Sequence, residues 1–264
     1  MLFFPEGTRL MKLDLQKASM LKRVSAWLLD MIFLMIVVVG AASLISVITG
    51  FDNYNNSMEG YYEKYESAYG VEFNISGEAY NAMTEAERKN YDDAYNALIH
   101  DDEAMYCYNM VVSLTLLTVS LGILIGYLVT EFLVPIILKN GQTVGKRIFG
   151  IAVVRTNFVK MNNVSLFIRT ILGKYTLETM IPVLVIMMIM FGMTGLEGTL
   201  LIVGILITEV VMLIATKTNS MIHDKLADTV TVDLASQLIF DTEEGMLEYK
   251  KRMSAENAAR SSYF

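Results

Sequence analysis

Four carboxyl groups lie within the longest apolar stretches of this 264-residue sequence: Asp30, Glu131, Glu178 and Glu209. An ionised carboxylate in hydrocarbon costs several kcal/mol, so such a group faces a protein interior, pairs with a cation or binds a proton. All four lie within roughly 12 Å of one membrane boundary, at ~1.5 Å of helix rise per residue. They predict either a set of ion pairs or a pathway for monovalent cations or protons.

Arg23 is the nearest basic partner in the sequence for one of these acids. It precedes Asp30 by seven residues, which places both side chains on one face of a helix, about two turns apart. The first interpretation is therefore a structural ion pair in which Arg23 is the counter-charge of Asp30. The second is that the carboxylates bind a transported cation or proton.

Three other motifs are too incomplete to predict an enzyme, a cofactor or a metal. Residues 4–9 match a phosphate-binding motif of glycerolipid acyltransferases, and His223 and Asp228 have the dyad spacing of that family, but in reversed order and without an α/β domain. Residues 141–147 are one residue short of a phosphate loop. The acidic cluster at residues 100–103 would point in several directions on a helix, which disfavours a metal site. We therefore expect no catalytic residues and no bound cofactor.

Membrane-spanning helices must position the four carboxyl groups. The chain is 54% hydrophobic, and the apolar residues gather in blocks near the ~17 to 25 residues that a bilayer requires. Lipid-exposed backbone must satisfy its own hydrogen bonds, so each block is predicted to be a helix. The predicted spans are residues 25–50, 110–138, 176–192 and 199–216.

The distribution of charge predicts the orientation of these spans. The leader at residues 1–24 has five basic residues, and residues 139–175 have seven basic residues and no acidic one. The insert at residues 51–109 has thirteen acidic residues and three basic ones. Basic flanks stay in the cytoplasm, so both termini, including the tail at residues 217–264, are predicted inside and the insert outside. The basic surface favours anionic lipid rather than nucleic acid as a partner.

The insert is predicted to be helical. Its tyrosines recur at spacings of three or four, and Thr84 with Glu87 matches a capping box. Residues 70–77 interrupt the pattern, so we expect two helices that extend the first and second spans. They would pack through tyrosines and through Leu98 and Ile99.

The segments predicted inside the cell are of two kinds. The β-branched runs at residues 150–155 and 229–234 are typical of strands, and we expect them to pair. Residues 164–175 alternate apolar groups with Arg169 and Lys174, the pattern of a helix that lies in the headgroup plane. The tail beyond residue 237 is predicted to be a soluble helix that frays at its end.

Three motifs together resemble the RDD family of membrane proteins, named for one Arg and two Asp. They are Arg23-x6-Asp30 with Ala26 between, Asn140 to Val154, and His223-Asp224 through Thr229-Val230. The resemblance assigns the family triad to Arg23, Asp30 and Asp224. It assigns the central motif to Gly141, Gly145, Lys146, Arg147 and Gly150, and Asp228 stands where a small residue is expected. The family implies a protein of the bacterial inner membrane, with cation/proton exchange as the expected activity.

The predicted fold is an all-α polytopic membrane protein with four transmembrane helices, a helical extracytoplasmic insert and a minor cytoplasmic β element. Two functions fit it. One is a small secondary transporter, acting as a homo-oligomer, that exchanges monovalent cations for protons. The other is a non-catalytic accessory or assembly protein that docks partners or anionic lipid. Carboxylates that line a cavity favour the first, and carboxylates that are all bound to Arg and Lys favour the second.

Overall fold

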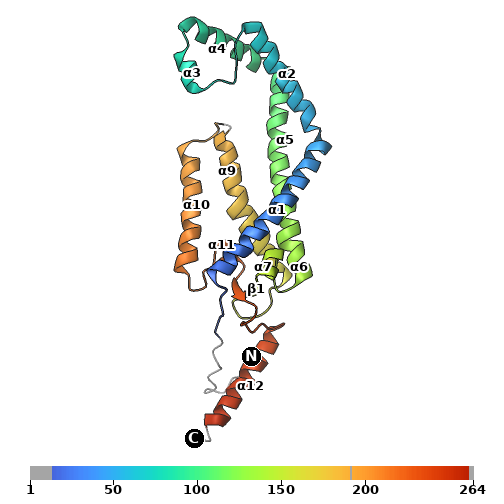
Figure 1. Cartoon of the computed structure of the whole chain (residues 1–264), viewed down its shortest axis with the longest axis vertical. Coiled ribbons are helices and arrows are strands. Elements are labelled where there is room, and N and C mark those ends of the chain that lie inside the picture. Colours follow the sequence, from blue (N-terminus) through green and yellow to red (C-terminus); the bar gives the residue numbers. More distant parts are fainter. Residues whose placement is uncertain (1–13, 191, 262–264) are drawn as a thin grey trace, which may run out of the picture. The chain divides into compact units, whose positions relative to one another are not determined.

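The chain, in a computed structural model, is described at residues 14–190 and 192–261 and is mainly helical (Figure 1). Val38–Ile123 forms one compact unit, and the parts before and after it form the other. The motif at residues 4–9 and the first part of the predicted leader 1–24 lie outside the described residues.

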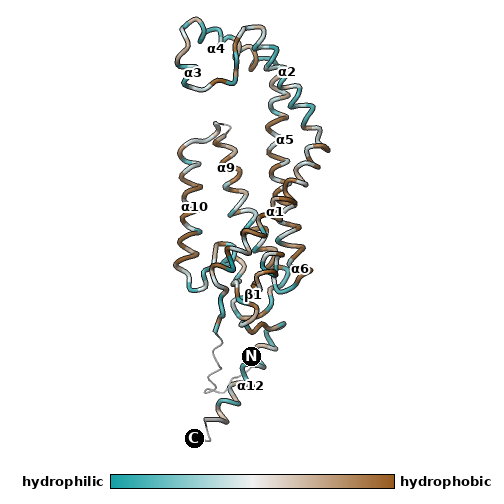
Figure 2. The backbone as a smooth tube through the Cα atoms, viewed as in Figure 1, coloured by the Kyte–Doolittle hydropathy of each residue, from teal (hydrophilic) through white to brown (hydrophobic). Residues whose placement is uncertain are grey.

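Four helices in the described part of the chain are long and apolar enough to cross a membrane. They are α1 (Met20–Thr49); α5 (Asp102–Tyr127) with η1 (Leu128–Leu133) and α6 (Val134–Leu138); α8 (Asn163–Phe167) with η2 (Ile168–Met180) and α9 (Ile181–Met190); and α10 (Leu196–Ala215). Figure 2 shows apolar residues along them, and few of their side chains are buried. Apolar surface of this extent needs lipid around it. The predicted fold class, an all-α polytopic membrane protein, is confirmed.

Residues 164–175, predicted as a separate helix in the headgroup plane, are helical but continuous with the residues that follow. This segment begins the third span, which is one helical stretch from Asn163 to Met190. Its apolar side faces outward, as the exposure of Leu172 shows. Arg169 and Lys174, expected to face the headgroups, turn inward instead, because acidic groups from other elements pair with them there.

Two stretches of π-helix set the direction of the charged side chains. η1 carries Glu131, and η2 carries Arg169, Lys174 and Glu178. An α-helix turns by about 100° per residue, so Arg169 and Glu178, nine positions apart, would point to opposite sides of it. The i→i+5 bonding of a π-helix lowers the turn to roughly 80°, and nine positions then complete about two full turns. The π-helix therefore gathers the charged side chains of η2 on one face.

A two-stranded antiparallel sheet anchors two short helices. β1 (Ile151–Arg155) pairs with β2 (Thr229–Asp233), so the predicted pairing of the two β-branched runs is confirmed. Both strands are buried along most of their length, with valines at the centre. α7 (Val144–Ile148) precedes β1 and α11 (Ile222–Leu226) precedes β2. The sheet thus holds the helices that carry Lys146 and Asp224.

The last element is α12 (Glu243–Ser261), a polar helix in the tail where one was predicted. Arg155 at the end of β1 donates from Nη1 to Glu243 Oε1 at 2.9 Å. An ion pair therefore joins the start of α12 to the sheet.

The insert contains α2 (Phe51–Tyr69), α3 (Gly77–Ala82) and α4 (Glu85–Ile99). The capping box of Thr84 and Glu87 is confirmed, and it starts α4. The core of the insert is formed by Met58, Leu98 and Ala104, with tyrosines packed around them.

The prediction that two helices continue the first and second spans into the insert is wrong in part. The second span does continue outward to Asp102, but α1 and α2 are separated by Gly50 in a left-handed conformation (φ 67°). α4 is separate from α5, because the Asp101 carboxylate accepts from the N–H groups of Glu103 and Ala104 and so starts a new helix. Ile99, expected in the insert core, is 36% exposed.

Candidate functional site

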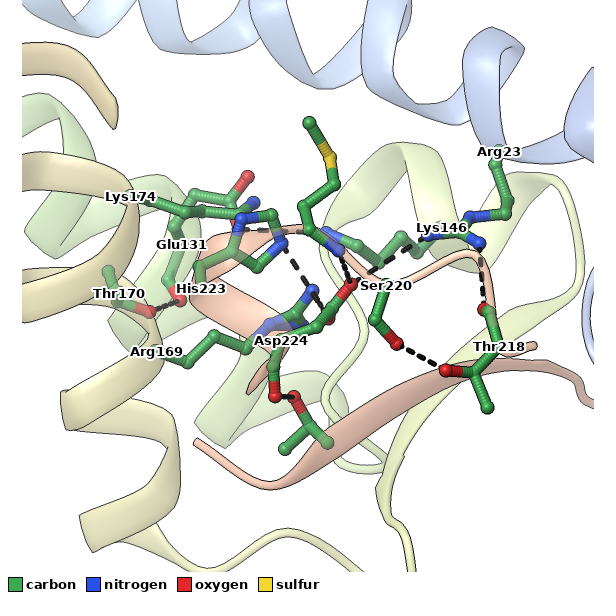
Figure 3. A network of polar contacts seen from close by, with 12 residues as sticks. Arg23, Glu131, Lys146, Arg169, Thr170, Lys174, Thr218, Ser220, His223 and Asp224 are labelled. Atoms are coloured by element: carbon green, nitrogen blue, oxygen red, sulfur yellow. Dashed lines mark hydrogen bonds and ion pairs between the residues drawn. The ribbon is translucent and has the colours of Figure 1, made fainter. Parts of the chain in front are cut away.

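Nine charged or titratable side chains meet in the unit formed by the two ends of the chain. They come from α1, η1, α7, η2 and α11, and we call them the charged network. Its members are Arg23, Asp30, Glu131, Lys146, Arg169, Lys174, Glu178, His223 and Asp224. Four are bases and four are acids, so the network is balanced when His223 is neutral. Figure 3 labels the members other than Asp30 and Glu178.

Asp224 is the most deeply buried acid of the network, with 1% of its surface exposed. Its Oδ1 accepts from Arg169 Nη2 at 2.7 Å, and its Oδ2 accepts from the N–H of Met221 at 3.2 Å. Burial alone would raise the pKa of Asp224, but Arg169 and the other positive groups around it outweigh burial and lower that pKa to about 2. Asp224 is therefore an ionised structural anchor at neutral pH.

The predicted pair of Arg23 with Asp30 is wrong. Arg23 Nη2 lies 3.8 Å from Asp224 Oδ2, and its Nη1 donates to the carbonyl of Thr218 at 3.4 Å. The two residues share a face of α1, but two helical turns are too far for a direct bond when Asp224 offers Arg23 a closer acid. The triad that the resemblance assigned is thus joined only in part, through Arg23 and Asp224.

Asp30 binds the start of α7 instead. It accepts hydrogen bonds from Thr143 Oγ1 and, at 2.7 Å, from the N–H of Gly145. Lys146 Nζ adds an ion pair at 3.7 Å. A Cβ at Gly145 would lie 2.3 Å from the carbonyl oxygen of Ala26, so only glycine permits α7 to approach α1 this closely. The acid of the first family motif therefore docks directly on the central motif.

Glu131 joins two lysines. Its Oε2 lies 2.7 Å from Lys174 Nζ and 3.5 Å from Lys146 Nζ. Its main-chain carbonyl accepts from Thr170 Oγ1 at 2.9 Å, which ties η1 to η2. Burial is the largest influence on Lys146 and lowers its pKa to about 8, although Glu131 and Asp30 oppose this shift. Burial therefore destabilises the charged form of Lys146, and the two acids offset this effect only in part.

The part of the site with the fewest compensating charges contains Glu178, His223 and Glu209. His223 Nδ1 lies 2.8 and 2.7 Å from the two carboxylate oxygens of Glu178. The main-chain N–H of His223 also donates to Glu178 Oε1 at 2.8 Å. Burial lowers the pKa of His223 despite the neighbouring Asp224 and Glu178. Both carboxyl oxygens of Glu209 are buried and have no hydrogen-bond partner among the described residues. Glu209 lies close enough to Glu178 for the two carboxyl groups to interact electrostatically.

A cavity of about 300 Å³ adjoins the network. Trp27, Met31 and Leu34 of α1 give it an apolar wall. Its acidic and basic lining comes from the network: Arg23, Asp30, Glu131, Lys146, Arg169, Lys174, Glu178 and His223. Three of the four carboxylates predicted to form a pathway, Asp30, Glu131 and Glu178, therefore line one cavity, and the fourth, Glu209, lies beside Glu178.

The glycines of the central motif shape the backbone. Gly141 and Gly150 have φ values of 61° and 63°, which glycine adopts without strain. Lys146 belongs to the network, whereas Arg147 is exposed and donates only to the carbonyl of Leu138 among the contacts of the described chain. Asp228, in place of a small residue, adopts a left-handed φ of 50°.

Sequence reasoning missed the roles of Thr143, Arg169, Lys174 and His223. Arg169 and Lys174 were expected at the membrane surface because an α-helical period was assumed. Residues 139–175 contain seven bases and no acid, so any buried base among them must pair with an acid elsewhere in the chain. This pattern could have indicated the inward-facing bases.

A family model described as the RDD family matches residues 17–228. The matched region contains the whole charged network and ends before α12. No curated protein and no solved structure matches the chain.

Proposed function

We propose that this chain, which belongs to the RDD family of membrane proteins, is a small secondary transporter that exchanges protons for monovalent cations. The proton is carried by Glu178, His223 and Glu209 beside the cavity. We place the protein in the bacterial inner membrane as a homo-oligomer, because four helices provide few walls for a pathway, and we assign it no enzymatic activity.

The observation that carries this proposal is the buried carboxyl group of Glu209. An ionised carboxylate without a partner is costly in a membrane-embedded site, so a proton is its simplest source of stabilisation. Two acids that approach one another cannot both ionise freely, and a histidine beside them provides a second place for the proton. Proton transfer between Glu209, Glu178 and His223 follows from this proximity.

The other acids of the predicted pathway are less suited to exchange. Asp30 and Glu131 each have a lysine within 3.7 Å, so a monovalent cation would have to compete with a covalently tethered ammonium. We therefore assign cation binding to Glu178 at the edge of the cavity, and a structural role to Asp30 and Glu131.

Proteoliposomes with an internal pH dye test the proposal. Wild-type protein should move protons when Na⁺, K⁺ or Li⁺ is added, and Glu209→Gln should fold normally but lose that flux. Glu197→Gln is the matched control, because Glu197 is an exposed acid on the same helix. Equal flux in wild type and Glu209→Gln, or no flux from folded wild-type protein with any of the three cations, would refute the proposal.

The orientation is a separate part of the proposal, supported by the charge asymmetry of the chain. A cysteine at Ser57 or Ser67, in a background without Cys107, should label from outside the cell, and one at Ser236 should not. All three positions are exposed, so accessibility to reagent does not differ between them. Labelling of Ser236 alone would reverse the orientation.

The accessory function is the second candidate, favoured by the pairing of Asp30, Glu131 and Asp224 with bases. Its lipid-docking surface is smaller than the sequence predicted, because Lys146, Arg169 and Lys174 are turned inward. The exposed bases Lys139 and Arg147 remain to contact anionic lipid. Removing both should leave proton flux intact and weaken binding to anionic vesicles, which separates the two functions.

A further inference from the structure

The insert contains an aromatic hollow that takes no part in the charged network. A cavity of about 450 Å³ is lined by Tyr62, Glu66, Phe73, Asn74, Tyr91 and Tyr95. We call it the aromatic cup. All of its residues belong to the unit Val38–Ile123.

The loop between α2 and α3 is held in place to form the floor of the cup. Gly70 ends α2 in a left-handed conformation, with φ 65°. Glu66 Oε1 then accepts the N–H of Phe73 at 2.7 Å, and Tyr91 donates to the carbonyl of Phe73 at 3.4 Å. Phe73 is therefore fixed from α2 on one side and from α4 on the other.

Aromatic rings surround Phe73 at close range. The centroids of Tyr62, Tyr91 and Tyr95 lie 6.0, 5.8 and 6.4 Å from that of Phe73, each in an edge-to-face arrangement. An edge-to-face pair places the edge of one ring against the face of the other, so each pair covers only one ring face. Glu66 adds a carboxylate to the same wall.

The electrostatic surroundings of the cup favour positive charge. Residues 51–109 carry thirteen acidic and three basic residues. Two of these bases already lie over tyrosine rings outside the cup, with Lys64 at 4.8 Å from the Tyr65 centroid and Arg88 at 5.4 Å from that of Tyr80. Basic side chains of the insert thus already contact tyrosine rings, and the rings of the cup could contact the cation of a ligand in the same way.

We propose that the aromatic cup binds small organic ammonium compounds. Aromatic faces attract alkylammonium groups, whose charge is spread over an apolar surface and whose desolvation costs less than that of a hydrated metal ion. Glu66 would supply the balancing negative charge. Binding here is independent of proton exchange in the charged network and goes beyond it.

Choline and its neutral isostere 3,3-dimethylbutan-1-ol separate charge from shape. With the full chain in nanodiscs, isothermal titration and saturation-transfer NMR should show choline binding in the millimolar range. The neutral isostere should bind roughly tenfold more weakly, as expected when a cation-aromatic contact and an ion pair are both lost. Equal binding of the two compounds, or no choline binding by folded protein, would overturn the proposal.

Two variants locate the site. Glu66→Gln keeps an oxygen that can accept the Phe73 N–H but removes the charge, and Phe73→Leu removes an aromatic face while leaving an apolar side chain. Each should weaken choline binding several-fold. Glu63→Gln, an exposed acid on the same helix, makes the same change in net charge outside the cup and should bind as wild type. If Glu63→Gln weakened binding as much as Glu66→Gln, a diffuse acidic surface rather than the cup would hold the cation.

Discussion

The insert and the charged network are both rich in charged residues, but they manage their charges in opposite ways. In the insert, most acids remain on the surface of regular α-helices, around a small apolar and tyrosine core. In the network, acids and bases from the long helix α1, from short helices and from π-helices are buried against one another. Water can solvate the first arrangement, whereas each charge of the second depends on a specific partner.

This difference shows what a membrane-embedded segment must do with a basic residue. A polar stripe on a helix in water simply faces outward. In the third span, the same pattern turns inward, because lipid surrounds the outside and acids on other elements are the better partners for Arg169 and Lys174. The two regions should therefore respond very differently to matched substitutions.

Removal of the Asp224 charge should have the largest effect. Asp224→Asn leaves Arg169 buried without its closest acid, and breaking one partner of such a pair costs ~3 to 5 kcal/mol. Asp93→Asn, at an exposed position of α4 in the insert, should leave the unfolding midpoint unchanged. Chemical unfolding in detergent measures both. If the two variants were equally stable, the proposed contrast between buried and solvated charge would fail.

Glycine substitutions should show the next largest difference. Gly145→Ala places a methyl group against the backbone of α1, and overpacking of this kind costs ~1 to 3 kcal/mol. Gly60→Ala in α2 meets nothing within 4 Å and should be neutral or slightly stabilising. Thermal unfolding of both variants checks the close approach of α7 to α1, and an unaffected Gly145→Ala protein would contradict it.

Alkaline pH should stabilise the network through Lys146. Its pKa is about 8 in the folded chain against an ordinary value of 10.5. Between these values the unfolded chain holds the proton and the folded chain has released it, so the free energy of unfolding rises with pH, by up to about 1.4 kcal/mol per unit. Lys146→Met should lack this rise between pH 8 and 10. Identical pH profiles for the two proteins would exclude Lys146 as its source.

The smallest effect is expected for an ion pair of the insert. Lys64 lies 3.2 Å from Asp101, but its side chain is 58% exposed. Water and salt screen such a pair, so Lys64→Gln should scarcely change the melting temperature. A shift as large as that of Asp224→Asn would show that solvated and buried pairs do not differ in this protein.

Regular features of the chain could be predicted from its sequence. The capping box of Thr84 and Glu87 and the strand character of β1 and β2 depend on residue type and spacing within a few positions. The membrane helices follow from length and hydrophobicity alone. The family resemblance rests on short motifs, and the family match covers all of them except Thr229 and Val230.

The partners within the network could not be predicted in the same way. An α-helical period would place Arg169 and Glu178 on opposite faces, whereas the π-helix brings them to one side. The partner of Asp30 is 115 residues away, at the N–H of Gly145. Neither a local period nor local spacing contains that information.

Infrared difference spectroscopy offers the most direct test of the central claim, that the buried Glu209 carboxyl group binds an exchangeable proton. Reconstituted wild-type protein should show the C=O stretching band of a protonated carboxyl group at neutral pH. That band should shift in ²H₂O and disappear in Glu209→Gln while remaining in Glu197→Gln. A wild-type spectrum that Glu209→Gln reproduces, with the same carboxyl bands at every pH, would contradict the claim.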